Sequence, residues 1–301
     1  MTVDYNELKK GGFLKQKQKD TFIVRFRSIA GNLTSEQLRK LAELADEYGR
    51  GYVHVTTRQG AEIPWVNIKD YNNMKKDIQD FGLTTGTCGP RIRTVVACPG
   101  SEVCHYGLMN SKESAIELDK VFFGRSVPMK TKIGVSGCPN SCAKPQENDI
   151  GFVGAIEPIL DGEKCIACGL CEKVCPNKAI SLAESKPVLD KSRCLLEGNC
   201  ISSCPVDAWQ EKRRGYLLYA GGKIGRKPRL GAVIGELIPE DGVTDAVEKV
   251  LQVFERLSQQ GERIADTISR VGTETFKEEM NLVQFENNIV TAEAVRQSEA
   301  G

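Results

Sequence analysis

Two cysteine pairs in the middle of the chain constrain its fold more than any other feature. Five residues separate Cys98 from Cys104, three separate Cys138 from Cys142, and a long stretch of chain lies between the pairs. Neither pair has the two-residue spacing that is typical of a zinc knuckle or a ferredoxin loop. Four thiolates from two separated loops suit an iron–sulfur cube held between segments of a larger fold. The chain therefore has to fold so that these two loops meet.

The composition and the cysteine count favour a soluble, cytoplasmic metalloprotein. With 301 residues, 40% of them hydrophobic, the chain is long enough for two or three domains. Its 41 basic and 40 acidic residues nearly cancel, so we expect neither nucleic acid nor a membrane as a partner. No segment has the ~18 apolar residues of a spanning helix, and the polar start is unlike a signal peptide. In such a chain, 12 cysteines indicate metal ligands rather than disulfides.

Residues 1–85 are predicted to form a compact α+β unit. Thr34 and Gln37 form a capping box, and apolar residues then recur at helical spacing up to Gly49. The other elements expected from the hydrophobic pattern are strands at 21–27, 51–56 and 60–66 and a helix at 70–81.

A second domain is expected from residues 86–159 together with residues 210–280, because its pattern is interrupted by a cysteine-rich module at 160–209. The predicted elements are strands at 92–97, 130–136, 149–156 and 215–220, and helices at 111–122, 243–257 and 262–280. Residues 281–301 show no clear period and are expected to be a tail or an arm. Taken together, these elements predict the α+β class.

The cysteine-rich module contains a bacterial ferredoxin loop and an altered second copy of it. By the crossed rule for such loops, the last cysteine of each copy ligates the other cluster. The first cluster would take Cys165, Cys168, Cys171 and Cys204. The second would take Cys175, Cys194 and Cys200, with Glu197 at the position of the missing cysteine.

Two interpretations of Glu197 stay open. Its carboxylate either supplies the fourth ligand, which would change the potential of that cluster, or lies in solvent beside a three-iron cluster. Zinc is a weaker alternative for the whole module, because both copies end in the Cys-Pro step of ferredoxins.

The two central cysteine pairs resemble the signature of the sulfite and nitrite reductases, in which a 4Fe–4S cluster is coupled to a sirohaem. The resemblance implies that Cys98, Cys104, Cys138 and Cys142 ligate this cluster, and that Cys142 also touches the haem iron. Together with the module, the chain would then hold three iron–sulfur clusters. It also implies a ferredoxin-like N-terminal unit and an α/β domain for sirohaem and cluster. The layout is most similar to small anaerobic, dissimilatory-like sulfite reductase subunits with an inserted ferredoxin domain.

Three basic segments resemble the substrate-binding segments of that family. Sulfite is a small dianion, so its pocket needs fixed cations and proton donors. Thr56–Gln59 is similar to a Thr-Arg-Gln turn, 91–95 to an arginine strand, and 129–133 to paired lysines that fall on one face of a strand. The residues that we expect to bind the substrate, which we call the cation cage, are Arg58, Arg93, Lys130 and Lys132.

A second set of residues is expected to meet the carboxylates of the sirohaem. Cations and backbone amides would bind the acids, and glycines would allow close approach. The residues of this set are Arg91, Gly221, Gly222, Lys223, Gly225 and Arg226. Three further residues are set aside: Cys88 as a free thiol, His105 as a structural hydrogen-bonding group, and His54 as a packing residue.

The resemblance implies the six-electron reduction of sulfite to sulfide. No flavin or nicotinamide motif is found, so the electrons are expected from ferredoxin or a partner subunit. Nitrite reduction to ammonia and a non-catalytic electron relay are the alternatives. Many relatives contain two copies of the fold and this chain has one, so a homodimer or a higher even oligomer is expected, with each site shared across a two-fold axis.

Overall fold

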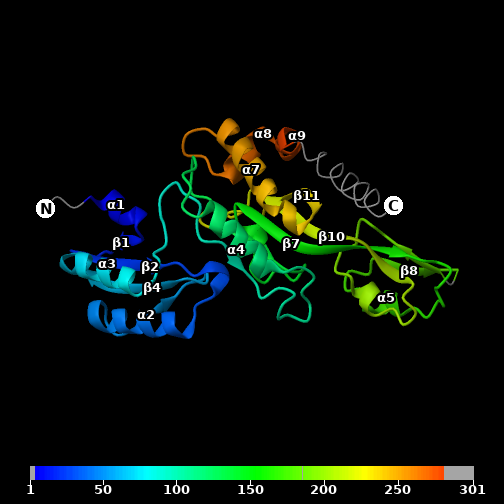
Figure 1. Cartoon of the computed structure of the whole chain (residues 1–301). Helices are drawn as coiled ribbons and strands as arrows, with labels where there is room; N and C mark the ends of the chain where they lie inside the picture. The colour runs from blue at the N-terminus through cyan, green and yellow to red at the C-terminus, as the bar shows by residue number, and fades with distance from the viewer. Residues whose placement is uncertain (1–3, 185, 281–301) are drawn as a thin grey trace, which may run out of the picture.

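The computed structural model describes residues 4–184 and 186–280. Figure 1 shows three bodies along the length of the molecule: the N-terminal unit, a central domain and the cysteine-rich module. The tail expected at 281–301 lies outside the described residues.

The N-terminal unit is a four-stranded antiparallel sheet that shares one core with its helices. The strand order is β1-β2-β4-β3, with β1 Phe13–Lys15, β2 Thr21–Phe26, β4 Ala61–Asn67 and β3 His54–Val55. The helices are α1 Tyr5–Lys10, α2 Ser35–Tyr48 and α3 Tyr71–Asp80. Thr34 and Gln37 each accept the other's backbone N–H, so the predicted capping box is confirmed. Leu41, Ile63 and Met74 are fully buried and join both long helices to the sheet.

The central domain is a mixed sheet that shares one core with its helices. Its order is β11-β10-β7-β6-β5, with β11 Ala232–Ile238, β10 Trp209–Ala220, β7 Ile150–Leu160, β6 Ile133–Ser136 and β5 Val96–Ala97. Strands β5, β6 and β7 are parallel, whereas β10 is antiparallel to both of its neighbours. The helices are α4 Ser111–Phe122, α7 Val243–Leu257, α8 Ile264–Val271 and α9 Thr273–Met280. Val247, Leu251 and Phe254 of α7 are fully buried, as the amphipathic pattern predicts.

Several elements differ from the prediction. Only Val96 and Ala97 of the strand expected at 92–97 lie in the sheet, and β6 begins three residues later than expected. The helical pattern at 262–280 is divided into two helices by Gly272, whose φ is 95°. Strands β1 and β11 were not predicted. The described residues also contain short 3₁₀ turns: η1 Ile29–Gly31, η2 Ile68–Asp70, η3 Pro145–Glu147 and η4 Glu240–Gly242.

The cysteine-rich module lies at the end of a long ribbon. Strands β7 and β10 pair from Ile150↔Ala220 to Leu160↔Trp209, and the module fills the chain between their far ends (Figure 1). It contains α5 Leu170–Val174, the hairpin of β8 Ile180–Ala183 and β9 Lys186–Leu189, and α6 Asn199–Ser202. Its buried core consists of Cys171, Ile180, Cys200 and Trp209. A core this small needs cross-links or metal to be stable.

Across residues 4–184 and 186–280, no helix combines the length and the apolar character that crossing a bilayer requires.

Candidate active site

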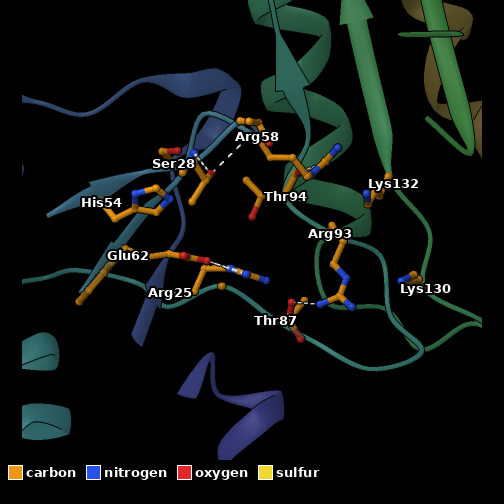
Figure 2. A pocket seen from close by; sticks show the side chains of 15 residues that line it. Arg25, Ser28, His54, Arg58, Glu62, Thr87, Arg93, Thr94, Lys130 and Lys132 are labelled. Atoms are coloured by element: carbon orange, nitrogen blue, oxygen red, sulfur yellow. Dashed lines mark hydrogen bonds and ion pairs between the residues drawn. The ribbon is translucent and has the colours of Figure 1, made fainter. Parts of the chain in front are cut away.

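A cavity of about 460 Å³ lies where the N-terminal unit meets the central domain, and all four residues of the cation cage line it. They come from three places in the fold. Arg58 lies in the turn between β3 and β4, Arg93 precedes β5, and Lys130 and Lys132 precede β6. Figure 2 shows them around one space, with Arg58 and Lys132 on one side and Arg93 and Lys130 on another.

Arg58 is held rigidly in the cavity wall. Its Nη1 donates to Asn148 Oδ1 at 2.7 Å and its Nη2 to the carbonyl oxygen of Thr94 at 3.0 Å. Burial lowers the pKa of Arg58 to about 10, the nearby arginines act in the same direction, and Asp149 opposes them. At this pKa the guanidinium stays charged at neutral pH, so the wall keeps a fixed positive charge.

Lys132 is the cage residue best suited to exchange a proton. Burial first, and then the neighbouring Arg58 and Arg263, lower its pKa to about 8, whereas Asp149 opposes them. An amine with this pKa is mostly charged at neutral pH but can release its proton close to that pH. Lys130, two residues earlier, is exposed at the rim.

Asp149 raises the pKa of Arg58 and Lys132 through its charge, but it is itself paired with Arg263 and forms no ion pair with the cage. The guanidinium of Arg93 donates to the carbonyl oxygens of Thr87 and Gly89, the latter at 3.0 Å, and not to a carboxylate. Among the described residues, none of the four cage residues forms an ion pair. The carboxylate in the lining, Glu62, is paired with Arg25 at 2.6 Å. The cavity can therefore hold a small anion through charge-assisted hydrogen bonds.

Sequence reasoning missed two residues of the cavity wall. His54 was expected to pack, but it lies exposed on the edge strand β3 and lines the cavity, so that expectation is wrong. The signal was its position two residues before Thr56, which also lines the cavity. Arg25 of β2 also lines it, and its Nη1 lies 3.4 Å from Cys88 Sγ, which places that buried thiol behind the wall.

Gln59 joins the cavity to the first cysteine loop. Its Nε2 donates to the Ala97 carbonyl oxygen at 2.7 Å, and the Ala97 N–H donates to its Oε1 at 3.0 Å. Gln59 has a φ of 60°, and its own carbonyl accepts the hydroxyl of Ser28. The turn that carries Arg58 is thereby fixed to the residue before Cys98.

The structure brings the four central cysteines together at one edge of the sheet. Cys98 follows β5 and Cys138 follows β6, so both lie at the carboxyl ends of adjacent parallel strands. The pKa of Cys138 is raised by burial and by the neighbouring thiols of Cys98, Cys104 and Cys142. The Gly137 N–H donates to Cys98 Sγ at 3.2 Å, an amide–sulfur bond of the kind that supports cluster thiolates.

The cysteines and the cage lie at opposite ends of β6. Lys132 precedes the strand and Cys138 follows it, and its four residues span about 13 Å. Cys142 is exposed in the loop that follows Cys138. Within one chain, therefore, the paired lysines and the cysteine edge are separated by the length of this strand.

Two small cavities in the cysteine-rich module match the crossed ligand sets. Cys165, Cys168, Cys171 and Cys204 line the first. Cys175, Glu197, Cys194 and Cys200 line the second. Over the described part of the chain, no three His, Cys, Asp or Glu side chains converge on a single ion. A cube has its thiolates on four separate iron atoms, so these sets fit a cluster better than a lone ion.

The two halves of the module repeat one backbone path. Positive φ angles recur at equivalent positions: 56° at Ala167 and 57° at Leu196, then 73° at Gly169 and 74° at Gly198. The last cysteine of each half also accepts an amide at 3.2 Å, from Ala179 to Cys175 and from Ala208 to Cys204. Burial raises the pKa of Cys200 to about 12.

Glu197 occupies in the second half the position that Cys168 has in the first. Its side chain is half-buried, and burial raises its pKa. Within the described residues its hydrogen-bonding partner is Asn199, at 3.4 Å, and no cation pairs with it. A half-buried carboxylate without a cation is a suitable ligand for iron.

The residues expected to bind the sirohaem carboxylates comprise one loop, 221–226, and Arg91, and they differ in how freely they could meet a ligand. Arg91 Nη1 reaches the Gly124 carbonyl oxygen at 3.4 Å and does not line the cavity. Gly221 and Gly222 are buried, and a Cβ on Gly222 would clash with the carbonyl oxygens of Gln146 and Asn148, so this close approach is to the protein backbone. Lys223 is paired with Asp266. Gly225 and Arg226 are exposed and stay accessible to an acidic group.

The fold and the site together define a class: a cysteine-rich α+β protein with grouped thiols and a cavity for a small anion. Residues 88–288 match the family model of the nitrite and sulphite reductase 4Fe-4S domain. Residues 14–81 match the nitrite/sulfite reductase ferredoxin-like half domain. The chain belongs to the nitrite and sulfite reductase family.

Named relatives support the same placement. The coenzyme F420-dependent sulfite reductase of Methanocaldococcus jannaschii is 36% identical over 282 residues, which cover 93% of this chain and 44% of the relative. This chain thus spans less than half of that protein. An anaerobic sulfite reductase subunit of Salmonella typhimurium is 28% identical, with 98% of this chain and 95% of the relative covered.

Solved structures share the fold. A crystal structure of dissimilatory sulfite reductase I superimposes with a TM-score of 0.69 at 19% identity, covering 86% of this chain and 69% of that one. The NirA protein of Mycobacterium tuberculosis gives a TM-score of 0.64 at 18% identity, covering 95% and 48%. These likenesses and the observed elements confirm the α+β class, with a ferredoxin-like half domain beside a reductase 4Fe-4S domain.

Proposed function

We propose that this chain reduces sulfite to sulfide. The observation that carries the proposal is the cavity whose four cations form no ion pair among the described residues. Family membership and relatives named sulfite reductases support the same chemistry. A chain that only relayed electrons would have no use for such a cavity.

The cage residues have distinct roles in this chemistry. The guanidinium groups of Arg58 and Arg93 hold the oxygens of the anion, each hydrogen bond being worth about 1.5–3 kcal/mol. Lys132, with a pKa of about 8, gives a proton to an oxygen that leaves as water and regains it from solvent. Lys130 adds charge at the rim. The balanced reaction takes up six electrons and seven protons per sulfite and releases hydrosulfide and three waters.

The chain's thiols would hold the redox groups. Cys98, Cys104, Cys138 and Cys142 would ligate the 4Fe–4S cluster, with Cys142 also meeting a sirohaem. When bound, this pair supplies electrons and an iron atom for the anion. The exposed Arg226 and Gly225 are available to the carboxylates of the haem, and Arg91 would need to leave its weak contact with Gly124 to join them.

The cysteine-rich module would hold two further clusters and accept electrons from an external donor, either ferredoxin or a partner subunit. The crossed sets supply the ligands, with Glu197 as the fourth ligand of the second cluster. The two lined cavities and the repeated backbone support this assignment. The small core of the module supports it too, because the clusters would supply the missing cross-links.

We further propose that two copies of the chain share their sites. The lysines of the cage and the cysteine edge lie at opposite ends of β6, so an isologous dimer would place the cage of one copy over Cys142 of the other. Mixing Cys142→Ala subunits with Lys132→Ala subunits should then restore about a quarter of the activity. If verified subunit exchange restores none, the sites are not shared.

The experiment that tests the function is an anaerobic absorption spectrum followed by reduced-dye oxidation with sulfite and with nitrite. Sirohaem bands and faster oxidation with sulfite are expected. Arg93→Gln should lower kcat/KM for sulfite about 10-fold or more, whereas the control Arg39→Gln, on an exposed face of α2, should not. A metallated protein without sirohaem bands would refute the proposal. Faster turnover of nitrite would assign the site to nitrite reduction instead.

A further inference from the structure

A buried ion pair lies outside the cavity, directly behind Lys132. Arg263 reaches Asp149 with both Nε, at 3.0 Å from Oδ1, and Nη2, at 2.7 Å from Oδ2. The Asp149 side chain is 0% exposed and that of Arg263 is 12% exposed. Neither residue lines the cavity, and sequence reasoning singled out neither.

This pair fixes the backbone of Lys132. The Lys132 N–H donates to Asp149 Oδ2 at 2.9 Å, and the Lys132 carbonyl accepts the Ile150 N–H at 3.1 Å. Asp149 is itself held by the Gly221 N–H, which donates to its carbonyl oxygen at 2.9 Å. Both backbone polar groups of Lys132, its N–H and its carbonyl, are therefore anchored. This anchoring fixes the direction in which the side chain leaves the backbone.

Helix α8 holds the arginine of this ion pair in place. Arg263 is the N-cap residue of α8, and its N–H donates to Asp266 Oδ2 at 3.2 Å. Asp266 also pairs with Lys223. The position of Arg263 is thus set by α8 and not by the cavity.

We propose that Arg263 and Asp149 are positioning residues, which from outside the cavity aim the amine of Lys132 at the anion and balance the charge around it. This proposal rests on the proposed function for the identity of the anion. It adds a positioning role for a part of the chain that does not touch the cavity.

The charges around Lys132 determine in which direction each substitution should shift its pKa. Arg58 faces it from the β3–β4 turn, Arg263 from the N-cap of α8, Lys130 from its own segment, and Asp149 from the residue before β7. Arg263 lowers the pKa of Lys132 and Asp149 raises it, both after the larger effect of burial. Loss of one partner should therefore move the titration of Lys132 in the direction opposite to loss of the other.

The test is competitive labelling of the Lys132 amine by acetic anhydride across pH, read by mass spectrometry on the full chain. The wild-type midpoint should lie near 8. Arg263→Gln should raise the midpoint, and Asp149→Asn should lower it, each by roughly half a pH unit or more. Arg270→Gln, which removes an arginine from the same helix, should leave it unchanged.

A purely structural role predicts another result. If both substitutions only loosened the site, Lys132 would become more exposed in each, and both midpoints would rise towards the value of a free lysine. That outcome, or two unchanged midpoints, would overturn the proposal.

Removing one partner of a buried pair can unfold a protein, so a second variant is needed. The double variant Arg263→Gln with Asp149→Asn leaves no buried charge of this pair without its partner, and its midpoint should lie between those of the single variants. A double-variant midpoint outside that range would contradict the proposal. In Arg263→Lys, which keeps the charge, the midpoint should stay close to that of the wild type. The labelling experiment needs neither haem nor sulfite. A result that contradicts the positioning role therefore leaves the proposed function untouched, and a protein that does not reduce sulfite can still show the expected midpoints.

Discussion

Gln59 offers a direct measure of how strongly the N-terminal unit is fastened to the cysteine edge of the sheet. Its amide makes two hydrogen bonds with the backbone of Ala97, at 2.7 and 3.0 Å, and Ala97 is 1% exposed. Gln59→Leu keeps the approximate size of the side chain and removes both bonds. Water has little access to Ala97, so its N–H and carbonyl would be left unpaired.

The expected cost follows from these two groups. Each buried polar group that loses its partner costs about 1–3 kcal/mol, so the variant should lose about 2–6 kcal/mol of unfolding free energy. That is a large part of the ~5–15 kcal/mol by which native proteins are stable. Because Ala97 immediately precedes Cys98, the iron content of the central cluster should fall as well.

Urea unfolding of the holoprotein, together with iron analysis, measures both effects, and the urea midpoint should fall by roughly 1 M. Gln79→Leu, on an exposed face of α3, is the control, and a surface substitution should change stability by less than about 0.5 kcal/mol. A Gln59→Leu midpoint equal to that of the control would refute the reasoning.

Gln59→Glu tests the same two hydrogen bonds with a side chain that can carry a charge. A carboxylate can still accept the Ala97 N–H, but it would face the Ala97 carbonyl without a proton to donate. The ionised form is disfavoured in the folded state, so the pKa of this carboxyl should be raised on folding, and the loss of stability should be largest at neutral pH. The stability should recover as pH falls and the carboxyl gains a proton. A loss that does not depend on pH would point to a steric cause.

Three further predictions concern other parts of the molecule. The apparent KM for sulfite should rise as pH increases through about 8, where Lys132 loses its charge, and Lys132→Arg should remove most of that dependence; equal pH profiles would argue against the assignment. Glu197→Cys should give the second cluster that we propose for the module the electron paramagnetic resonance spectrum of a four-thiolate cluster, and an unchanged spectrum would count against carboxylate ligation. Gly222→Ala should cost about 1–3 kcal/mol in thermal unfolding because its Cβ meets the Gln146 carbonyl, whereas Gly162→Ala, with open space around it, should be neutral; similar losses in both would show that this contact is not limiting.

Local signals predicted the elements whose stabilising contacts lie close in sequence. The helix α2 begins at a capping box formed by Thr34 and Gln37, and the burial of α7 follows its own apolar stripe. Strand β11 has no such local signal, since pairing with β10 is what places it in the sheet. In the same way, residues 92–95 have a strand-like sequence, but only Val96 and Ala97 find a partner in β6.

In the site, too, local sequence patterns predicted some residues, whereas others depend on contacts between distant parts of the chain. Arg58, Arg93, Lys130 and Lys132 could be selected because each lies in a short segment with a recognisable pattern. The partners that hold them could not. Asn148 meets Arg58 across the domain boundary, and Arg263 comes from α8 to reach Asp149. Contacts of this kind depend on how the bodies pack, and no short pattern in the sequence records them.

The ribbon of β7 and β10 has a consequence for how this protein can be taken apart. Two antiparallel strands need only a two-residue turn to connect them, so the residues between Leu160 and Trp209 are not needed to close the hairpin. A version of the chain with a tight turn there should still fold into the N-terminal unit and the central domain, without the module that we propose to carry electrons. Because the module is inserted into a single hairpin, another small domain could replace it without any change to the strands that hold it.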